Sequence, residues 1–177
     1  TWIYKGLKEL KPIDLKNIEV VIHLAAAGVS PKKASIFELD QINVKESFRL
    51  IKLSQVAGVK RIIVTGTCLE YGEEANKWDK IPSDASLKPL CAYSKSKAKS
   101  FKLLFDFAAK NQIKLFYGRI FSAYGDGQYE NNFWPSLKYA AISGNDFPMT
   151  CGEQIRDFIR VEAVAEHLLN AIIRKDL

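Results

Sequence analysis

Paired cysteines, closely spaced metal ligands and long apolar runs are missing from this sequence, and each absence excludes a class of protein. The three cysteines, Cys68, Cys91 and Cys151, are odd in number and far apart, which argues against a disulfide framework and against a zinc site. No apolar run approaches the roughly 18 residues that a membrane span requires, and the first residues lack a signal-peptide pattern. We therefore expect reduced thiols, no metal and no membrane span, in a protein of the cytoplasm.

Charge is unbalanced toward the basic side but is not concentrated in one segment. The formal net charge of +6 would suit anionic partners such as a dinucleotide or a nucleotide-sugar. The lysines are nevertheless scattered along the expected helix faces, so solvated faces explain the charge better. They form no block that alternates with aromatic residues, and nucleic-acid binding is not expected. The 177 residues, 47% hydrophobic and 26% charged, have the composition of one globular domain with its own core.

Short apolar runs alternate with longer amphipathic segments along the chain. The runs are typical of strands buried on both faces of a parallel sheet, and they cover Val20–Leu24, Arg61–Thr65 and Ile113–Tyr117. Helical spacing of apolar residues predicts helices over Phe37–Ala57, Cys91–Lys110, Phe133–Ile142 and Val161–Ile173. We expect Gly58 to cap the first helix and Glu73–Leu90 to form a long surface loop. The alternation predicts a parallel α/β sheet in which the three strands are neighbours.

A phenol and an ammonium group fall one turn apart on the second of these helices. Tyr93 and Lys97 share a helix face, and Thr67 brings a hydroxyl to the end of the preceding strand. A nearby lysine cation would lower the pKa of the phenol from about 10, so that the tyrosine could exchange a proton with a substrate oxygen. The spacing alone is weak evidence, because Tyr4 and Lys8 repeat it and a solvated helix face has the same pattern.

Further segments follow in an order that resembles the extended short-chain dehydrogenase/reductase family, the NAD-dependent sugar epimerases, dehydratases and reductases. The matching segments are His23-Leu24-Ala25-Ala26, Asn43-Val44, Thr67-Cys68-Leu69-Glu70-Tyr71-Gly72, Tyr93 with Lys97, Arg119-Ile120-Phe121-Ser122-Ala123-Tyr124-Gly125 and Arg156-Asp157-Phe158-Ile159-Arg160-Val161. Ser122 stands where the family has asparagine. The resemblance covers nearly the whole chain.

The resemblance implies a division of labour among named residues. Thr67, Tyr93 and Lys97 would be catalytic. NAD or NADP would be bound by Leu24, Ala25, Ala26, Thr65, Tyr93 and Lys97. A nucleotide-sugar would be bound by Tyr124, Asn132 and Arg156. For Thr67 the alternative is a local bond to a loop backbone group, and for Arg156 it is a surface pair with Asp157.

The glycine-rich fingerprint of dinucleotide-binding folds has no counterpart here, although it belongs after the first strand of such a fold. Val20–Leu24 corresponds instead to the fourth strand of the family. We therefore expect a Rossmann-like, doubly wound parallel sheet that lacks the N-terminal βαβ unit. Residues 1–177 would form a partial NAD(P)-binding domain, with part of a small substrate lobe at about 120–177. The chain would be a central fragment of a larger enzyme or a truncated gene product.

The catalytic segment also narrows the reaction. Cys68 and Leu69 stand where the family's dehydratases carry an acidic pair, and Glu70 is shifted by one place, so 4,6-dehydration is disfavoured. The sequence favours an epimerase or 4-keto-reductase of surface-polysaccharide or deoxysugar biosynthesis. The alternatives are a non-catalytic relative that binds a nucleotide or a protein, and an inactive fragment.

The remaining expectations concern packing and assembly. His23 is expected to be a packed core histidine, and Asn43 a buried hydrogen-bonding residue behind the site. Arg119 is expected to be structural, and Arg160 to help with phosphate. The helices Phe37–Ala57 and Cys91–Lys110 lie where the family forms its dimer interface, so we expect a homodimer whose shared apolar patch includes Phe48, Phe101 and Phe105. The alternative is that these aromatic side chains face the sheet.

Overall fold

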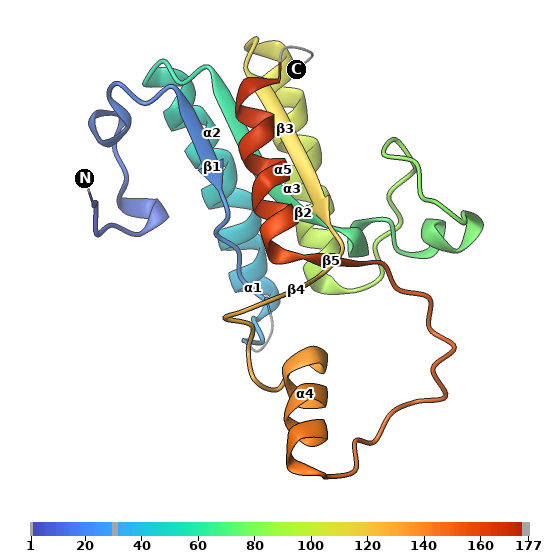
Figure 1. The fold of residues 1–177 in the computed structure, drawn as a ribbon. Helices are drawn as coiled ribbons and strands as arrows, with labels where there is room; N and C mark the ends of the chain where they lie inside the picture. Colours follow the sequence, from blue (N-terminus) through green and yellow to red (C-terminus); the bar gives the residue numbers. More distant parts are fainter. Residues whose placement is uncertain (1, 30–31, 175–177) are drawn as a thin grey trace.

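The main sheet lies at the centre of the molecule, and its strands are parallel. The computed structural model describes residues 2–29 and 32–174 (Figure 1). Its three-stranded sheet has the order β1-β2-β3, formed by Val20–His23, Arg61–Thr67 and Lys114–Ile120. Both neighbouring pairs are parallel, which confirms the predicted topology. Leu24 lies beyond the end of β1, and β3 continues past Tyr117 to Ile120.

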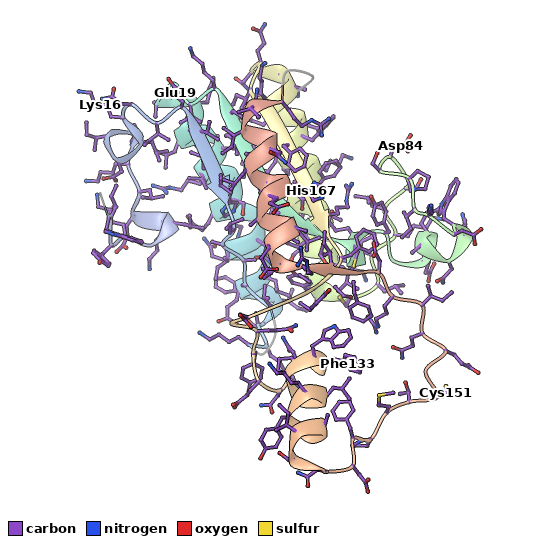
Figure 2. All side chains as sticks on the ribbon, in the orientation of Figure 1. Lys16, Glu19, Asp84, Phe133, Cys151 and His167 are labelled. Atoms are coloured by element: carbon purple, nitrogen blue, oxygen red, sulfur yellow. The ribbon has the colours of Figure 1, made fainter. Side chains whose placement is uncertain are left out.

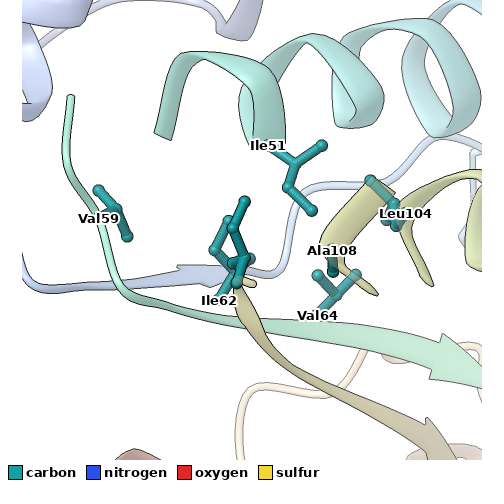
Figure 3. Packing of buried hydrophobic residues seen from close by; sticks show 7 residues of the cluster. Ile51, Val59, Ile62, Val64, Leu104 and Ala108 are labelled. Carbon is teal, nitrogen blue, oxygen red and sulfur yellow. The ribbon is translucent and has the colours of Figure 1, made fainter. Parts of the chain in front are cut away.

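Helices cover both faces of this sheet because β2 is apolar on both sides. Ile62 and Val64 pack against Ile51 and Leu104, which come from α2 (Ser47–Val56) and α3 (Ala92–Lys110) (Figure 3). On the opposite face, the fully buried Ile63 packs against α5 (Val161–Ile173). Each such side chain stabilises the fold by about 1.5–3 kcal/mol through its removal from water. The two covered faces confirm the doubly wound, Rossmann-like fold.

The first long helix has a π-helical middle, which was not predicted. It consists of α1 (Ile36–Glu38), a π-helical turn η3 (Leu39–Glu46) and α2, in continuous succession. The helix ends as expected at Gly58, whose φ of 82° is accessible to glycine without strain. Two 3-10 turns, η1 (Leu7–Glu9) and η2 (Pro12–Leu15), precede β1.

The loop after β2 is more ordered than a plain surface loop. It contains the 3-10 turns η4 (Cys68–Glu70) and η5 (Glu73–Lys77). Gly72, with φ of 52°, pairs with Lys88 and so closes the loop. A Cβ atom at Gly72 would collide with the Lys88 carbonyl oxygen, so the position requires glycine.

A smaller unit extends beyond the carboxyl ends of the main strands. Strand β4 (Ser122–Tyr124) pairs in parallel with β5 (Phe158–Arg160), and α4 (Phe133–Ser143) stands apart from the main sheet (Figure 1). Phe133, at the start of α4, contacts the rings of Trp134, Phe147 and Phe158 (Figure 2). This aromatic cluster holds α4 to β5, although 144–157 is a long connection without regular structure. We call β4, α4 and β5 the lobe.

Candidate active site

Thr67 is the last residue of β2 and begins the tight turn η4. Its hydroxyl oxygen accepts the Leu69 amide at 3.4 Å, and its own amide donates to Glu70 Oε1 at 2.9 Å. The alternative role considered for Thr67, a local hydrogen bond to a loop backbone group, is therefore present in the structure. It does not exclude a catalytic role, because a hydroxyl that accepts a hydrogen bond can still donate one.

Lys97 joins the predicted catalytic helix to the end of β2. Its ammonium group donates to the Thr65 carbonyl oxygen at 2.7 Å, and the residue is only 5% exposed. Burial lowers the pKa of Lys97, and the charge of Glu70 opposes that shift. The Thr65 hydroxyl in turn donates to the His23 carbonyl oxygen at 3.5 Å. The residues predicted to bind the cofactor on α3 and β2 thus lie together, next to the end of β1.

Tyr93 is half-buried and lies against the loop that follows β1. Gly28, with φ of 78°, has no room for a side chain there, since a Cβ atom would lie 3.2 Å from Tyr93 Cδ2 and 2.7 Å from Leu39 Cδ2. The expectation that Lys97 would lower the pKa of Tyr93 is wrong for this structure. Burial raises the pKa of Tyr93, and the charge of Glu70 raises it further. Tyr93 is therefore a neutral phenol at neutral pH, a form suited to donating a proton.

Asn43 connects three parts of the site from within the π-helical turn. Its Oδ1 accepts the Ala27 amide at 2.8 Å, and its Nδ2 donates to the Ala27 carbonyl at 3.1 Å and to Ser96 Oγ at 3.0 Å. Ser96 Oγ donates to the Tyr93 carbonyl at 2.7 Å. Asn43 is thus the buried hydrogen-bonding residue that was predicted, and it ties the loop after β1 to α3.

His23 is a core residue, also as predicted. Its Nε2 is hydrogen-bonded to Ser47 Oγ at 2.8 Å, and the side chain is buried. Burial, followed by the charge of Lys97, lowers the pKa of His23 to about 4. The imidazole is therefore neutral at neutral pH.

A buried ion pair that was not predicted from the sequence lies directly behind Thr67. Glu70 is fully buried, and its Oε2 accepts a hydrogen bond from Arg119 Nε at 3.0 Å, while Tyr117 donates to its Oε1 at 3.0 Å. Arg119 was expected to be structural and Glu70 was given no role. No local pattern in the sequence shows this pair, because it depends on the register of the parallel pair of β2 and β3, in which Gly66 is the partner of Arg119. A glycine opposite an arginine leaves space for a large buried group.

An open cleft of about 1170 Å³ lies beside Thr67 and Tyr93. The residues next to Thr67 and Tyr93 in the chain, Cys68 and Ser94, line it. Other lining residues come from 69–81, the start of α3, the junction of β3 and β4 (Phe121 and Ser122) and the segment before β5. The cleft therefore lies at the carboxyl ends of the strands, where open α/β sheets bind their ligands.

The predicted substrate residues lie on or beside the lobe. The exposed Arg156 donates two hydrogen bonds to Gln154 Oε1, from Nε at 3.3 Å and from Nη2 at 3.0 Å. The alternative that was considered for Arg156 was a pair with Asp157, and these bonds go to Gln154 instead. Burial raises the pKa of the Cys68 thiol, and the positive charge of Arg156 opposes this rise. Tyr124, on β4, has its ring 5.5 Å from that of Trp134, and Asn132 directly precedes α4, at its N-cap position.

Neither a metal-ligand cluster nor a membrane-crossing helix is found among residues 2–29 and 32–174. Within these ranges no three His, Cys, Asp or Glu side chains are grouped so that they could hold a metal ion. Over the same residues, no helix combines the length and the apolar character that crossing a bilayer requires.

Comparison with known proteins identifies a family model for almost the whole chain. The model of the NAD dependent epimerase/dehydratase family matches residues 10–176. The chain is 26% identical over 175 residues to a dTDP-6-deoxy-L-talose 4-dehydrogenase (NAD(+)) of Aggregatibacter actinomycetemcomitans, covering 97% of this chain and 62% of the relative. It is 30% identical over 180 residues to a UDP-glucose 4-epimerase of Erwinia amylovora, covering 88% of this chain and 52% of the relative.

Solved structures agree with these relatives. MoeE5 in complex with UDP-glucose and NAD superposes with a TM-score of 0.81 at 33% identity, over 98% of this chain and 59% of that one. A UDP-N-acetylglucosamine 4-epimerase from Methanobrevibacter ruminantium M1, in complex with UDP-N-acetylmuramic acid, superposes with a TM-score of 0.86 at 25% identity, over 98% and 57%. The chain thus spans between about half and about three fifths of the length of the proteins that it matches.

Proposed function

The chain belongs to the NAD dependent epimerase/dehydratase family, and on that premise we propose that it carries the catalytic residues of an NAD-dependent enzyme acting on a nucleotide-sugar. The observation that supports this most is the bond from Lys97 Nζ to the Thr65 carbonyl oxygen, at 2.7 Å. It fastens α3, which also carries Tyr93, to the end of β2, two residues before Thr67. Hydride chemistry on an alcohol or ketone is assisted by a positioned proton donor or acceptor, and these three side chains would supply one, together with a hydroxyl and a cation, at one edge of the sheet.

The residues present suit a bound dinucleotide. The Lys97 ammonium has three hydrogens and directs one to Thr65, so it retains the capacity to bind ribose hydroxyl groups. Leu24, Ala25 and Ala26 follow β1 directly, and the alanines leave the strand end accessible to a flat ring. NAD, when bound, supplies or accepts the hydride.

Tyr93 and Thr67 would then handle the substrate oxygen. In a reduction, Tyr93 donates its phenolic proton to the carbonyl oxygen as the carbonyl carbon gains the hydride, and Thr67 holds that oxygen by a hydrogen bond. In the reverse direction, Tyr93 would have to be deprotonated first, and its phenolate would then take the hydroxyl proton as the carbon gives up the hydride. The raised pKa of Tyr93 favours the protonated acid, which suits the reductive direction.

The reaction would occur at a sugar carbon that bears a hydroxyl or keto group, without dehydration. Cys68 and Leu69 offer no acid–base pair for the expulsion of water. The two curated relatives are named as a 4-dehydrogenase and a 4-epimerase, which supports a 4-keto-reductase or a 4-epimerase. Tyr124, Asn132 and Arg156 would bind the nucleotide-sugar from the lobe. We place the enzyme in surface-polysaccharide or deoxysugar biosynthesis, in the cytoplasm and as a homodimer.

The test is turnover by the longest natural gene product that contains this chain. It would be assayed for oxidation of NADH and NADPH with a panel of 4-keto nucleotide-sugars, and for epimerisation of the corresponding 4-hydroxy compounds. Turnover of one member supports the enzyme and separates the two reactions. If NAD binds and no member reacts, the non-catalytic relative is the better description. If NAD does not bind either, the inactive fragment is.

A further inference from the structure

Both carboxylate oxygens of Glu70 are engaged at the end of β2, out of contact with water. Oε1 accepts from the Thr67 amide at 2.9 Å and from the Tyr117 hydroxyl at 3.0 Å, and Oε2 accepts from Arg119 Nε at 3.0 Å. The residue is 0% exposed. Removing a carboxylate and a guanidinium from water costs more than their attraction returns in many proteins, so a buried ion pair is weak evidence for a role in stability. Its position suggests another role.

The same network reaches the catalytic helix. The Tyr117 hydroxyl, which donates to Glu70, also lies within hydrogen-bonding distance, 3.2 Å, of the Lys97 carbonyl oxygen. Glu70 therefore contacts the backbone of Thr67 directly and the backbone of Lys97 through one side chain. These two backbones carry the strand-end hydroxyl and the helix-borne cation that the proposed function requires.

Arg119 is held from several sides, which makes the network rigid. Its guanidinium carbon lies 4.3 Å from the ring centre of Phe101 on α3 and 5.1 Å from that of Tyr71. Its Nη1 donates to the Ser83 carbonyl oxygen at 3.3 Å. A planar cation between aromatic faces with directed donors has few alternative positions. Glu70 is consequently fixed by a partner that cannot move far.

The strand itself leaves space for this network. A Cβ atom at Gly66 would collide with the Tyr117 ring and would lie 2.6 Å from Glu70 Oε1. The residue immediately before Thr67 thus has no side chain at the point where the carboxylate turns back under the strand. The backbone of β2 at Gly66 therefore fits closely against the side chains of Glu70 from η4 and of Tyr117 and Arg119 from β3.

We propose that Glu70, clamped by Arg119 and Tyr117, is a positioning residue that fixes Thr67 relative to the face of α3 that carries Tyr93 and Lys97. The inference rests on the proposed function, which assigns the catalytic roles to those three residues. The charge of Glu70 has a second effect, because after burial it is the largest cause that raises the pKa of Tyr93. Cys91 and Cys68 raise the pKa of Tyr93 as well, more weakly.

The first test needs no activity. Amide hydrogen exchange of Thr67 would be measured by NMR in the wild type, in Glu70→Gln and in the double variant Glu70→Leu/Arg119→Met, which replaces the ion pair by apolar groups of similar size. The amide of Ile63, in the core of the same strand, is the internal reference. In the double variant Thr67 should exchange at least about tenfold faster while Ile63 is unchanged. Equal protection of Thr67, or equal loss at both positions, would overturn the inference. If the double variant does not fold, a shift of the Thr67 amide proton resonance in Glu70→Gln replaces it, and an unmoved resonance overturns the inference in the same way.

The second test uses the pH dependence of turnover. In Glu70→Gln, kcat should fall about 10-fold to 100-fold with KM little changed. The basic limb of the reductive profile should move to lower pH, because a negative charge that raises the pKa of Tyr93 is gone. Glu73→Gln, the same change on an exposed residue of the neighbouring turn, is the control. A fall in kcat at every pH without a moved limb would indicate a merely structural role and would overturn the inference. If the wild type turns over nothing, the proposed function has failed, and the exchange experiment still decides the role of Glu70.

Discussion

The phenol of Tyr93 is the group whose removal tests the chemistry most directly. Tyr93→Phe keeps the ring that packs at Gly28 and removes the transferable proton. In the full-length enzyme, turnover should fall about 10²–10⁴-fold with little change in substrate affinity, because the acid is lost and the packing is kept.

Thr67→Ala should lower turnover less than Tyr93→Phe, since Thr67 positions the oxygen without supplying the proton, and Lys97→Met should impair both NAD binding and turnover. Tyr4→Phe is the matched control, because Tyr4 shares the Tyr-x-x-x-Lys spacing and is 93% exposed. Wild-type turnover by Tyr93→Phe on a verified substrate would contradict the mechanism.

His23 makes stability depend on pH, and the sign follows from its pKa. The pKa of His23 is lowered from 6.5 to about 4 in the folded chain, so the unfolded chain takes up the proton first as the pH falls. The contribution of the neutral His23 to the free energy of unfolding is therefore fully present above about pH 6.5. It is lost as the pH falls toward 4, by about 3 kcal/mol in total. Urea unfolding at pH 7, 5.5 and 4 should show this loss.

A matched pair of variants isolates the histidine. His23→Asn keeps a hydrogen-bonding group near Ser47 and removes the titrating ring, so its stability should depend less on pH over this interval. His167→Asn makes the same change at the other histidine, which is exposed on α5 (Figure 2). It should leave the pH dependence as in the wild type. If both variants behave alike, the loss has another source, such as the carboxylates.

How far the site could be predicted differs between its residues. Tyr93, Lys97 and Thr67 lie in local patterns that sequence shows, and Lys97 indeed reaches the end of β2. The rise in the pKa of Tyr93 could not be predicted, because burial and the distance to Glu70 depend on packing between β2, β3 and α3. The ion pair of Glu70 and Arg119 joins residues 49 apart in the chain. Only the strand register brings them together.

At the scale of elements, periodicity predicted the order and type of the regular structure well. The predicted bounds of α5 agree with the structure, and α3 begins one residue after the predicted start, with Cys91 as its cap. The π-helical turn Leu39–Glu46 was not predicted, because its apolar spacing is close to that of an ordinary helix. π-Helical turns are rare and are frequently found at functional sites. Here it carries Asn43, whose tertiary bonds are a physical reason for the distortion.

The bonds of Asn43 give a prediction at this scale. Asn43→Ala would leave the amide and the carbonyl of Ala27 without their partner. An unsatisfied buried polar group costs about 1–3 kcal/mol. Ala27 is half-buried, so water can satisfy its groups in part, and the variant should lose about 1–3 kcal/mol of unfolding free energy. The control is Asn170→Ala, the same change at an exposed position of α5, which should stay within about 0.5 kcal/mol of the wild type. Thermal and urea unfolding measure both, and equal stability of the two variants would show that the connection is not needed.

For the whole molecule, the structure revises which residues could form the predicted dimer interface. Phe48 packs edge-to-face on Phe107, with 5.4 Å between ring centres, and Phe101 packs on Tyr117 at 4.8 Å. Both rings are half-buried and have partners within the chain, as expected for aromatics that face the interior. Phe105, by contrast, is 55% exposed on α3. The predicted apolar patch on α3 is therefore centred on Phe105.

Self-association through this patch is the last prediction. An exposed aromatic on a long helix is costly in a monomer and stabilising when a second copy covers it. Multi-angle light scattering at micromolar concentrations should give the mass of a dimer. Phe105→Glu would place a charge at the centre of the interface and should weaken the dimer at least about 30-fold, which corresponds to roughly 2 kcal/mol. Tyr139→Glu, the same kind of change at a 69% exposed aromatic on α4, should leave the mass unchanged. A wild type that is monomeric across this concentration range would refute the dimer. A dimer that survives Phe105→Glu would place the interface elsewhere than on this face of α3.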